Sequence, residues 1–197
     1  MAKVIKFPIV APEKFGLERV RKKKDAPPDK KGQLHLFLGG KVVQLNRLST
    51  FEEALMHDEQ GDIATARNQY LKAIETGDAL ADAYCNLGII EYRSNNITKA
   101  VDYFTLGLKH DPRHFEAHYN LANLYADAGN ILLAKMHYKI AIEMEPTFPN
   151  SYFNLGLTLA MNKEFEEAIS ALTHYRAITP DYDHAQTNEL IMKLAGR

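Results

Sequence analysis

Three short stretches decide the fold: NLGIIEY at residues 86–92, NLANLYA at 120–126 and NLGLTLA at 154–160. They start at a constant offset of 34 residues, which indicates an internal structural repeat. With residue 47 as the first repeat position, the chain holds four repeats, at 47–80, 81–114, 115–148 and 149–182. A period of this length is typical of a helix-turn-helix unit that buries its apolar face only by stacking on its neighbours.

The positions that recur have packing roles. Positions eight and twenty are small, which lets the two helices of a unit approach closely, and position twenty-four is bulky and fills the gap beside them. Turn residues Gly61, Asn95 and Gly129 tolerate a positive φ, and a proline at position thirty-two ends the second helix. The recurring residues are Ala54, Gly88, Ala122 and Gly156 at position eight, Ala66, Ala100, Ala134 and Ala168 at twenty, Tyr70, Phe104, Tyr138 and Leu172 at twenty-four, and Pro112, Pro146 and Pro180 at thirty-two.

This pattern resembles the tetratricopeptide repeat family over residues 47–182. The resemblance implies an all-α fold, a right-handed α-solenoid whose concave face is lined by the first helix of each pair. Repeat one departs from the pattern, with Glu53 where the other repeats have leucine and with Asp78 in place of the proline. Terminal repeats are commonly atypical.

The last residues predict where the array stops. Position twenty-seven is small in the first three repeats but is Tyr175 in the fourth, so a standard fifth repeat would not fit. Leu190, Ile191 and Leu194 form one apolar stripe at helical spacing. We therefore expect residues 183–197 to form a single helix that caps the solenoid.

Binding residues are expected on the concave face. The family resemblance implies that repeat positions two, five, six, nine, twelve and thirteen point inward. An amide both donates and accepts, so a row of asparagines is suited to the backbone of an extended peptide, with apolar neighbours taking its side chains. A similar asparagine ladder occurs in the repeats of the enzyme that transfers N-acetylglucosamine to protein hydroxyls, although Asn before Leu-Gly is also common in these repeats for helix reasons alone. The predicted groove residues are Asn86, Asn120, Asn154, Ile89, Arg93, Tyr119, Asn123, Phe153 and Leu157. Arg93 is the only basic residue among the inward positions, which argues against recognition of acidic chaperone tails.

Composition narrows the classes of function. The chain has 197 residues, 46% of them hydrophobic, a formal net charge of -1 and a single cysteine, Cys85, so that it forms no intramolecular disulfide and no cysteine-based zinc cluster. The charged, proline-containing start lacks the apolar core of a signal peptide, and no stretch is long and apolar enough for a membrane span, so we predict a cytoplasmic protein of bacterial type.

Catalytic and metal motifs are not evident in the sequence. His114 and His118 are four residues apart, a spacing at which two histidines of a helix can face one metal ion. In HFEAH, however, the acid Glu116 is at the wrong offset for the zinc protease motif. The simpler interpretation is that both histidines are surface residues at a repeat junction. We predict a non-enzymatic protein with no cofactor, no metal and no small-molecule substrate.

The N-terminal residues differ from the repeats in charge. Residues 1–46 contain eleven Lys or Arg against four acids, a net charge of +7, which leaves -8 for the remainder. Residues 1–32 have the composition of a disordered arm, which either binds a polyanion such as nucleic acid or docks on the body of the protein. The candidate polyanion contacts are Arg19, Arg21, Lys22, Lys23 and Lys24.

Residues 33–46 allow two interpretations. Gly39-Gly40 between two apolar runs predicts a short β-hairpin-like segment that packs on the uncovered face of repeat one. Alternatively, Gln33, Leu34, Leu36 and Phe37, within QLHLF, resemble the pentapeptide by which bacterial proteins dock on the replication sliding clamp.

The sequence thus predicts a protein-interaction scaffold that binds a protein or peptide in its groove. The alternative is a nucleic-acid-associated or sliding-clamp-associated adaptor that uses the basic arm and QLHLF.

Overall fold

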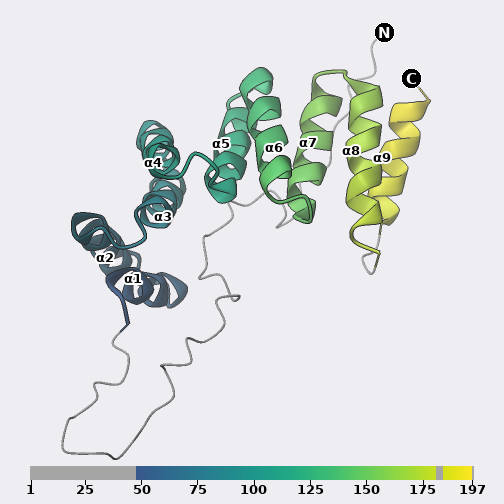
Figure 1. Cartoon of the computed structure of the whole chain (residues 1–197). Helices are drawn as coiled ribbons and strands as arrows, with labels where there is room; N and C mark the ends of the chain where they lie inside the picture. The colour runs from purple at the N-terminus through teal and green to yellow at the C-terminus, as the bar shows by residue number, and fades with distance from the viewer. Residues whose placement is uncertain (1–47, 181–183, 197) are drawn as a thin grey trace, which may run out of the picture.

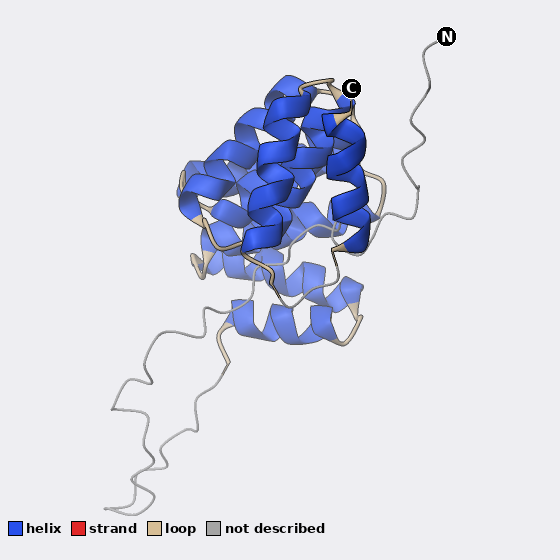
Figure 2. Ribbon diagram, turned by 90° about the vertical axis from the view of Figure 1, so that its right-hand side faces the viewer, coloured by secondary structure: helices blue, strands red, loops and turns tan. Residues whose placement is uncertain are grey.

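The computed structural model describes residues 48–180 and 184–196. Within these ranges the chain forms nine α-helices and no strand (Figure 2). The helices are α1 (Thr50–Glu59), α2 (Ile63–Thr76), α3 (Leu80–Arg93), α4 (Ile97–His110), α5 (Phe115–Asp127), α6 (Ile131–Met144), α7 (Pro149–Met161), α8 (Phe165–Ala177) and α9 (Ala185–Ala195). The predicted hairpin at residues 33–46 and the basic arm at 1–32 lie outside the described residues.

The helices form a twisted solenoid. Each odd-numbered helix packs on the next even-numbered one, and each pair packs on the following pair in chain order. Figure 1 shows the progressive rotation: α1 to α4 are seen nearly end-on, whereas α5 to α9 are seen lengthwise. The all-α solenoid expected from the repeat is therefore confirmed for the described residues. None of their helices combines the length and the apolar character that crossing a bilayer requires.

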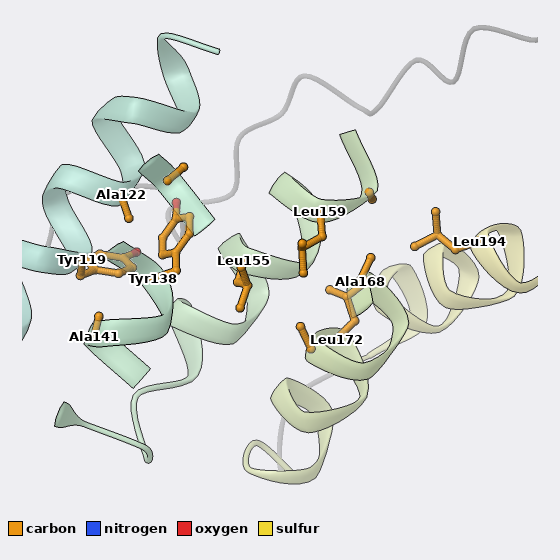
Figure 3. Packing of buried hydrophobic residues seen from close by; sticks show 12 residues of the cluster. Tyr119, Ala122, Tyr138, Ala141, Leu155, Leu159, Ala168, Leu172 and Leu194 are labelled. Atoms are coloured by element: carbon orange, nitrogen blue, oxygen red, sulfur yellow. The ribbon is translucent and has the colours of Figure 1, made fainter. Parts of the chain in front are cut away.

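Small residues at position eight are required by what lies opposite them. A Cβ added to Gly88 would lie 2.6 Å from a ring carbon of Phe104, and one added to Gly156 would lie 2.7 Å from Cγ of Leu172. Both distances are far below van der Waals contact, so the close approach of α3 to α4 and of α7 to α8 depends on glycine. Figure 3 shows the corresponding core of the C-terminal repeats, where Leu155 and Leu172 lie between Tyr138 and the last helix.

A positive φ occurs at the same turn position in all four repeats. Position fifteen has φ 82° at Gly61, 61° at Asn95, 73° at Gly129 and 65° at Lys163. Glycine and asparagine tolerate this left-handed conformation well. Lys163 adopts the same conformation although it has neither the missing Cβ of glycine nor the short polar side chain of asparagine.

One departure in repeat one, Asp78 in place of the proline, is explained by the start of α1. Ser49 forms a reciprocal capping box with Glu52. The carboxylate of Asp78, which replaces the proline, accepts a hydrogen bond of 2.8 Å from the backbone N–H of Phe51. Ser49 and Asp78 thus satisfy two of the free N–H groups at the start of α1, the first helix of the described residues.

The array ends at α9, which packs on α8. Leu194 is 2% exposed within the C-terminal core cluster, and Leu190 and Ile191 pack against that cluster. The Tyr175 ring is buried between Phe153, at a centroid distance of 5.0 Å, and His184, at 5.6 Å. The bulky residue at position twenty-seven is thus enclosed by a side chain of α7 and by the residue that precedes α9.

Candidate functional site

The asparagine row is buried in the interior of the solenoid. The exposed fractions of Asn86, Asn120 and Asn154 are 1%, 0% and 0%. The expectation that these amides point into solvent in the absence of a peptide is therefore wrong. The first helices α3 and α5, and α5 and α7, touch each other. Asn120 and Asn154 lie at these contacts, and Asn86 faces Tyr70 of α2.

Each asparagine bonds to the preceding repeat. Asn86 Nδ2 donates to the hydroxyl of Tyr70 over 3.1 Å, and Asn120 Nδ2 contacts the Cys85 sulfur at 3.6 Å. Asn154 Nδ2 donates to the Tyr119 hydroxyl at 3.0 Å. The row therefore links repeats one to two, two to three and three to four by polar contacts in a buried environment, where a satisfied hydrogen bond also fixes the register of stacking.

The network is most extended between repeats three and four. Asn154 Nδ2 also donates to Asn123 Oδ1 at 2.9 Å, and the same oxygen accepts from the Tyr138 hydroxyl at 2.6 Å. Burial raises the pKa of Tyr138 well above its ordinary value, so this hydroxyl remains a protonated donor. One sequence signal pointed to this role: a buried tyrosine needs a partner for its hydroxyl, and Tyr70 and Tyr138 sit at position twenty-four, where an apolar ring would suffice for packing.

Three of the nine predicted groove residues have accessible side chains. Ile89, Tyr119 and Asn123 are buried together with the asparagine row, at 1%, 0% and 5% exposure. Arg93 is exposed, and Phe153 and Leu157 are half-buried. Phe153 and Leu157 are one turn apart on α7, and Met161, one turn further, is 60% exposed. The accessible part of the predicted groove is therefore an apolar strip on α7 and the end of α3.

A second accessible feature is the row of residues that end the first helices. Glu59, Arg93, Asp127 and Met161 are the last residues of α1, α3, α5 and α7, and all four are exposed. They occupy the same repeat position, thirteen, and we call them the terminal row. The Tyr92 hydroxyl donates to Asp127 Oδ2 at 2.5 Å and so ties α3 to α5.

A hollow of about 460 Å³ opens at the centre of the terminal row. Its lining includes Arg93 and Asp127 together with the apolar side chains of Ile97 and Leu124. Burial and the bond to Asp127 raise the pKa of Tyr92 to about 12, so the link across this hollow is held by a neutral phenol over the physiological range. Within residues 48–180 and 184–196, Arg93 has no ion-pair or hydrogen-bond partner.

The histidines at the junction of repeats two and three are structural groups, and His114 and His118 do not face each other. His114 Nδ1 accepts from the backbone N–H of Ala117 and caps α5, while its Nε2 lies 2.9 Å from Asp82 Oδ1. His118 Nδ1 instead lies 2.9 Å from Nδ1 of His137 on α6, and its Nε2 lies 3.2 Å from the Pro112 carbonyl. The interpretation of His114 and His118 as surface residues is wrong, since both are buried, at 5% and 7% exposure.

These contacts also set the titration of the histidines. Burial lowers the pKa of His114, but the bond to Asp82 and the charges of Glu116 and Asp82 outweigh it, so the pKa lies above its ordinary value. Burial lowers the pKa of His118, and burial together with the charge of His118 lowers the pKa of His137 to about 4. No group of three or more His, Cys, Asp or Glu among the described residues could hold a metal ion.

The predicted clamp-type motif and the predicted polyanion contacts both precede residue 48 and lie outside the described residues. The motif comprises Gln33, Leu34, Leu36 and Phe37, and the contacts comprise Arg19, Arg21, Lys22, Lys23 and Lys24. They stay predictions from the sequence.

Comparison with known proteins identifies the same kind of repeat. Family models described as tetratricopeptide repeat match residues 51–112, 85–134 and 137–170. The chain belongs to the tetratricopeptide repeat family. The family fold is generally a non-catalytic scaffold, and the described part of this chain has that fold.

The curated relatives are much longer than this chain. The human protein O-mannosyl-transferase TMTC3 is 32% identical over 107 residues, which cover 52% of this chain and 12% of that protein. The UDP-N-acetylglucosamine–peptide N-acetylglucosaminyltransferase of Giardia intestinalis is 32% identical over 108 residues, or 54% of this chain and 7% of that enzyme. The chain thus spans about a tenth of the length of these relatives.

Solved structures share the fold at low identity. The MamA protein superposes with a TM-score of 0.64 at 20% identity, covering 75% of this chain and 81% of its own. YrrB, described as a repeat protein with an unusual peptide-binding site, has a TM-score of 0.57 at 20% identity, with coverage of 68% and 69%. The first repeat domain of Spaghetti (RPAP3), solved with the HSP90 peptide SRMEEVD, has a TM-score of 0.55 at 17% identity, with coverage of 59% and 91%.

Proposed function

We propose that this protein is a non-enzymatic scaffold that holds an extended segment of a partner protein against the accessible side of its first helices. The observation that carries the proposal is the apolar strip on α7. Leu157 is half-buried and Met161 is 60% exposed, whereas Leu155 and Leu159, on the other face of the same helix, are buried at 6% and 1%. Phe153 packs on Tyr175, so Leu157 and Met161 are the members of the strip that remain accessible beyond the core contacts.

The remaining predicted groove residues support the proposal in a different way. Asn86, Asn120 and Asn154 cannot reach a ligand without leaving their buried bonds, so we assign them to the rigidity of the scaffold. A rigid row of helices lowers the entropy lost on binding, because the accessible residues are already ordered. Two structural neighbours are described with a bound peptide or a peptide-binding site, which is consistent with the same mode of use here.

Site-specific photo-crosslinking in cells tests this proposal. A photoreactive amino acid at Leu157 is expected to form discrete crosslinks to a small number of proteins. The matched control is the same amino acid at Leu71, an exposed apolar position on α2, a second helix of the repeat array. Equal crosslinking patterns at the two positions, or none at Leu157, would contradict a specific binding surface on α7.

A further inference from the structure

We propose that the terminal row reads the charge pattern of the bound segment, a step that rests on the proposed function. Glu59, Arg93, Asp127 and Met161 present acid, base, acid and thioether in that order along the array. An extended partner segment lying along the row would carry the complementary order: a base, an acid, a base and a large apolar residue. The occupant is therefore an extended peptide segment of alternating charge that ends on an apolar side chain.

The position of the row supports direct access for such a segment. All four residues occupy the same position in successive repeats, and stacking of the repeats places that position once in each step along the array. Arg93 and Asp127 line one hollow of about 460 Å³, which shows that neighbouring members of the row face a common space. That volume is large enough for side chains of a partner.

Local helix physics does not account for the acids in this row. The C-terminus of a helix carries partial negative charge, which favours Lys or Arg there and disfavours Asp or Glu. Glu59 and Asp127 end their helices against that preference. The Tyr92 hydroxyl stabilises Asp127 at its position, whereas Glu59 has no hydrogen-bond or ion-pair partner among the described residues. A residue that breaks a local rule without such a contact is expected at a functional position.

The Asp127 carboxylate is ordered and the Arg93 guanidinium is available to a partner segment. The Tyr92 hydroxyl fixes the Asp127 carboxylate by its 2.5 Å hydrogen bond, and Arg93 has no partner within the part of the chain that the structure describes. A guanidinium beside apolar walls, here Ile97 and Leu124, is suited to a carboxylate because it offers several fixed donors at reduced solvent exposure.

The spacing of the row predicts the spacing of the motif. Packed helices lie roughly 8 to 10 Å apart, and α5 touches both α3 and α7. An extended chain advances about 3.3 to 3.6 Å per residue, so each step of the row corresponds to about three residues. The predicted motif is base-x-x-acid-x-x-base-x-x-apolar, read in either chain direction.

A random peptide display library tests the inference with the intact protein. Selection is expected to enrich peptides with an acid about three residues from a base and about six from Leu, Met or Phe. Binding of these peptides should fall about tenfold with Arg93→Glu and recover when the acid of the peptide is changed to lysine. Met161→Lys should weaken the same peptides whatever their charge order.

The control is Lys72→Glu, which makes the same charge change at an exposed position on α2 away from the row. It should change binding by no more than about twofold, the size expected for a screened surface charge. Thermal unfolding of each variant checks that the fold is intact. Asp127→Asn serves as a second probe that keeps the hydrogen-bond acceptor of Tyr92 while removing the charge.

The outcomes separate the two proposals. Peptides that bind and depend on Leu157 but not on Arg93 or Asp127 would overturn the charge-pattern inference and leave the scaffold function in place. Enriched peptides without the alternating pattern would overturn it as well. A library that yields no binder would overturn the scaffold function itself, and the inference with it.

Discussion

Replacing Asn154 with alanine separates a structural role from a binding role. Asn154 is fully buried and donates two hydrogen bonds, to the Tyr119 hydroxyl at 3.0 Å and to Asn123 Oδ1 at 2.9 Å. A hydrogen bond of this kind contributes about 0.5 to 1.5 kcal/mol net, so the loss of two costs about 1 to 3 kcal/mol. Asn154 Oδ1 has no hydrogen-bond partner among the described residues, and removing that buried acceptor offsets part of the loss. We therefore expect a destabilisation of about 2 kcal/mol.

The measurement is thermal and urea unfolding of Asn154→Ala beside two controls. For a domain of this size, about 2 kcal/mol lowers the Tm by about 4 to 8 °C. Asn150→Ala, on the same helix but half-buried, should shift the Tm little, and Leu157→Ala should weaken partner capture more than stability. The interpretation would be refuted if Asn154→Ala melted like the wild type and had lost its partner, because that result requires an amide that faces the ligand.

Three further predictions follow from local geometry. Gly88→Ala should cost about 1 to 3 kcal/mol, because its Cβ would lie 2.6 Å from the Phe104 ring, and Phe104→Leu should restore part of the loss; both are measured by urea unfolding. Lys163→Gly should raise stability by about 1 kcal/mol, because φ is 65° there, whereas Lys163→Ala should not. The pKa of His137 is lowered to about 4 in the folded protein, so the unfolded state takes up the proton first and stability falls as the pH is lowered from about 6.5 toward 4. Between pH 7 and pH 5 this contributes about 1 kcal/mol after solvent screening, and the urea midpoint of His137→Gln should depend correspondingly less on pH.

The fold can be predicted from the sequence because packing strictly limits the size of the residue at a small number of positions in each repeat. Gly88 and Gly156 face bulky side chains of the second helix across a gap that admits no Cβ, so their spacing along the chain reports the contact directly. The left-handed turns leave a similar mark in Gly61 and Gly129. The turn at Lys163 could not be predicted in this way, because it has the same left-handed conformation without a glycine or an asparagine.

The site could be predicted only in part, because burial at position six depends on how far successive repeats rotate. An amide is compatible with a solvent-facing ladder and with a buried network, and the residue type alone does not distinguish them. Glu91 illustrates the same difficulty: it is 1% exposed, pairs with Arg67 of the preceding repeat and accepts from Asn96 at 2.8 Å. A carboxylate at that position suggests a solvated face until the partner from the other repeat is known.

Some repeat positions serve packing and others vary in chemistry, and this difference links the fold to the proposed function. Positions eight, twenty and twenty-four keep their size in every repeat, since the helices could not otherwise approach. Position thirteen changes from acid to base to acid to methionine, while all four residues remain exposed at the end of a first helix. Packing restricts the size of this residue little, and only Asp127 among the four takes part in a hydrogen bond between helices of the described residues, with Tyr92. In a solenoid whose interior is held by buried amides and hydroxyls, a regularly spaced and chemically varied row is the kind of surface that can distinguish one extended segment from another.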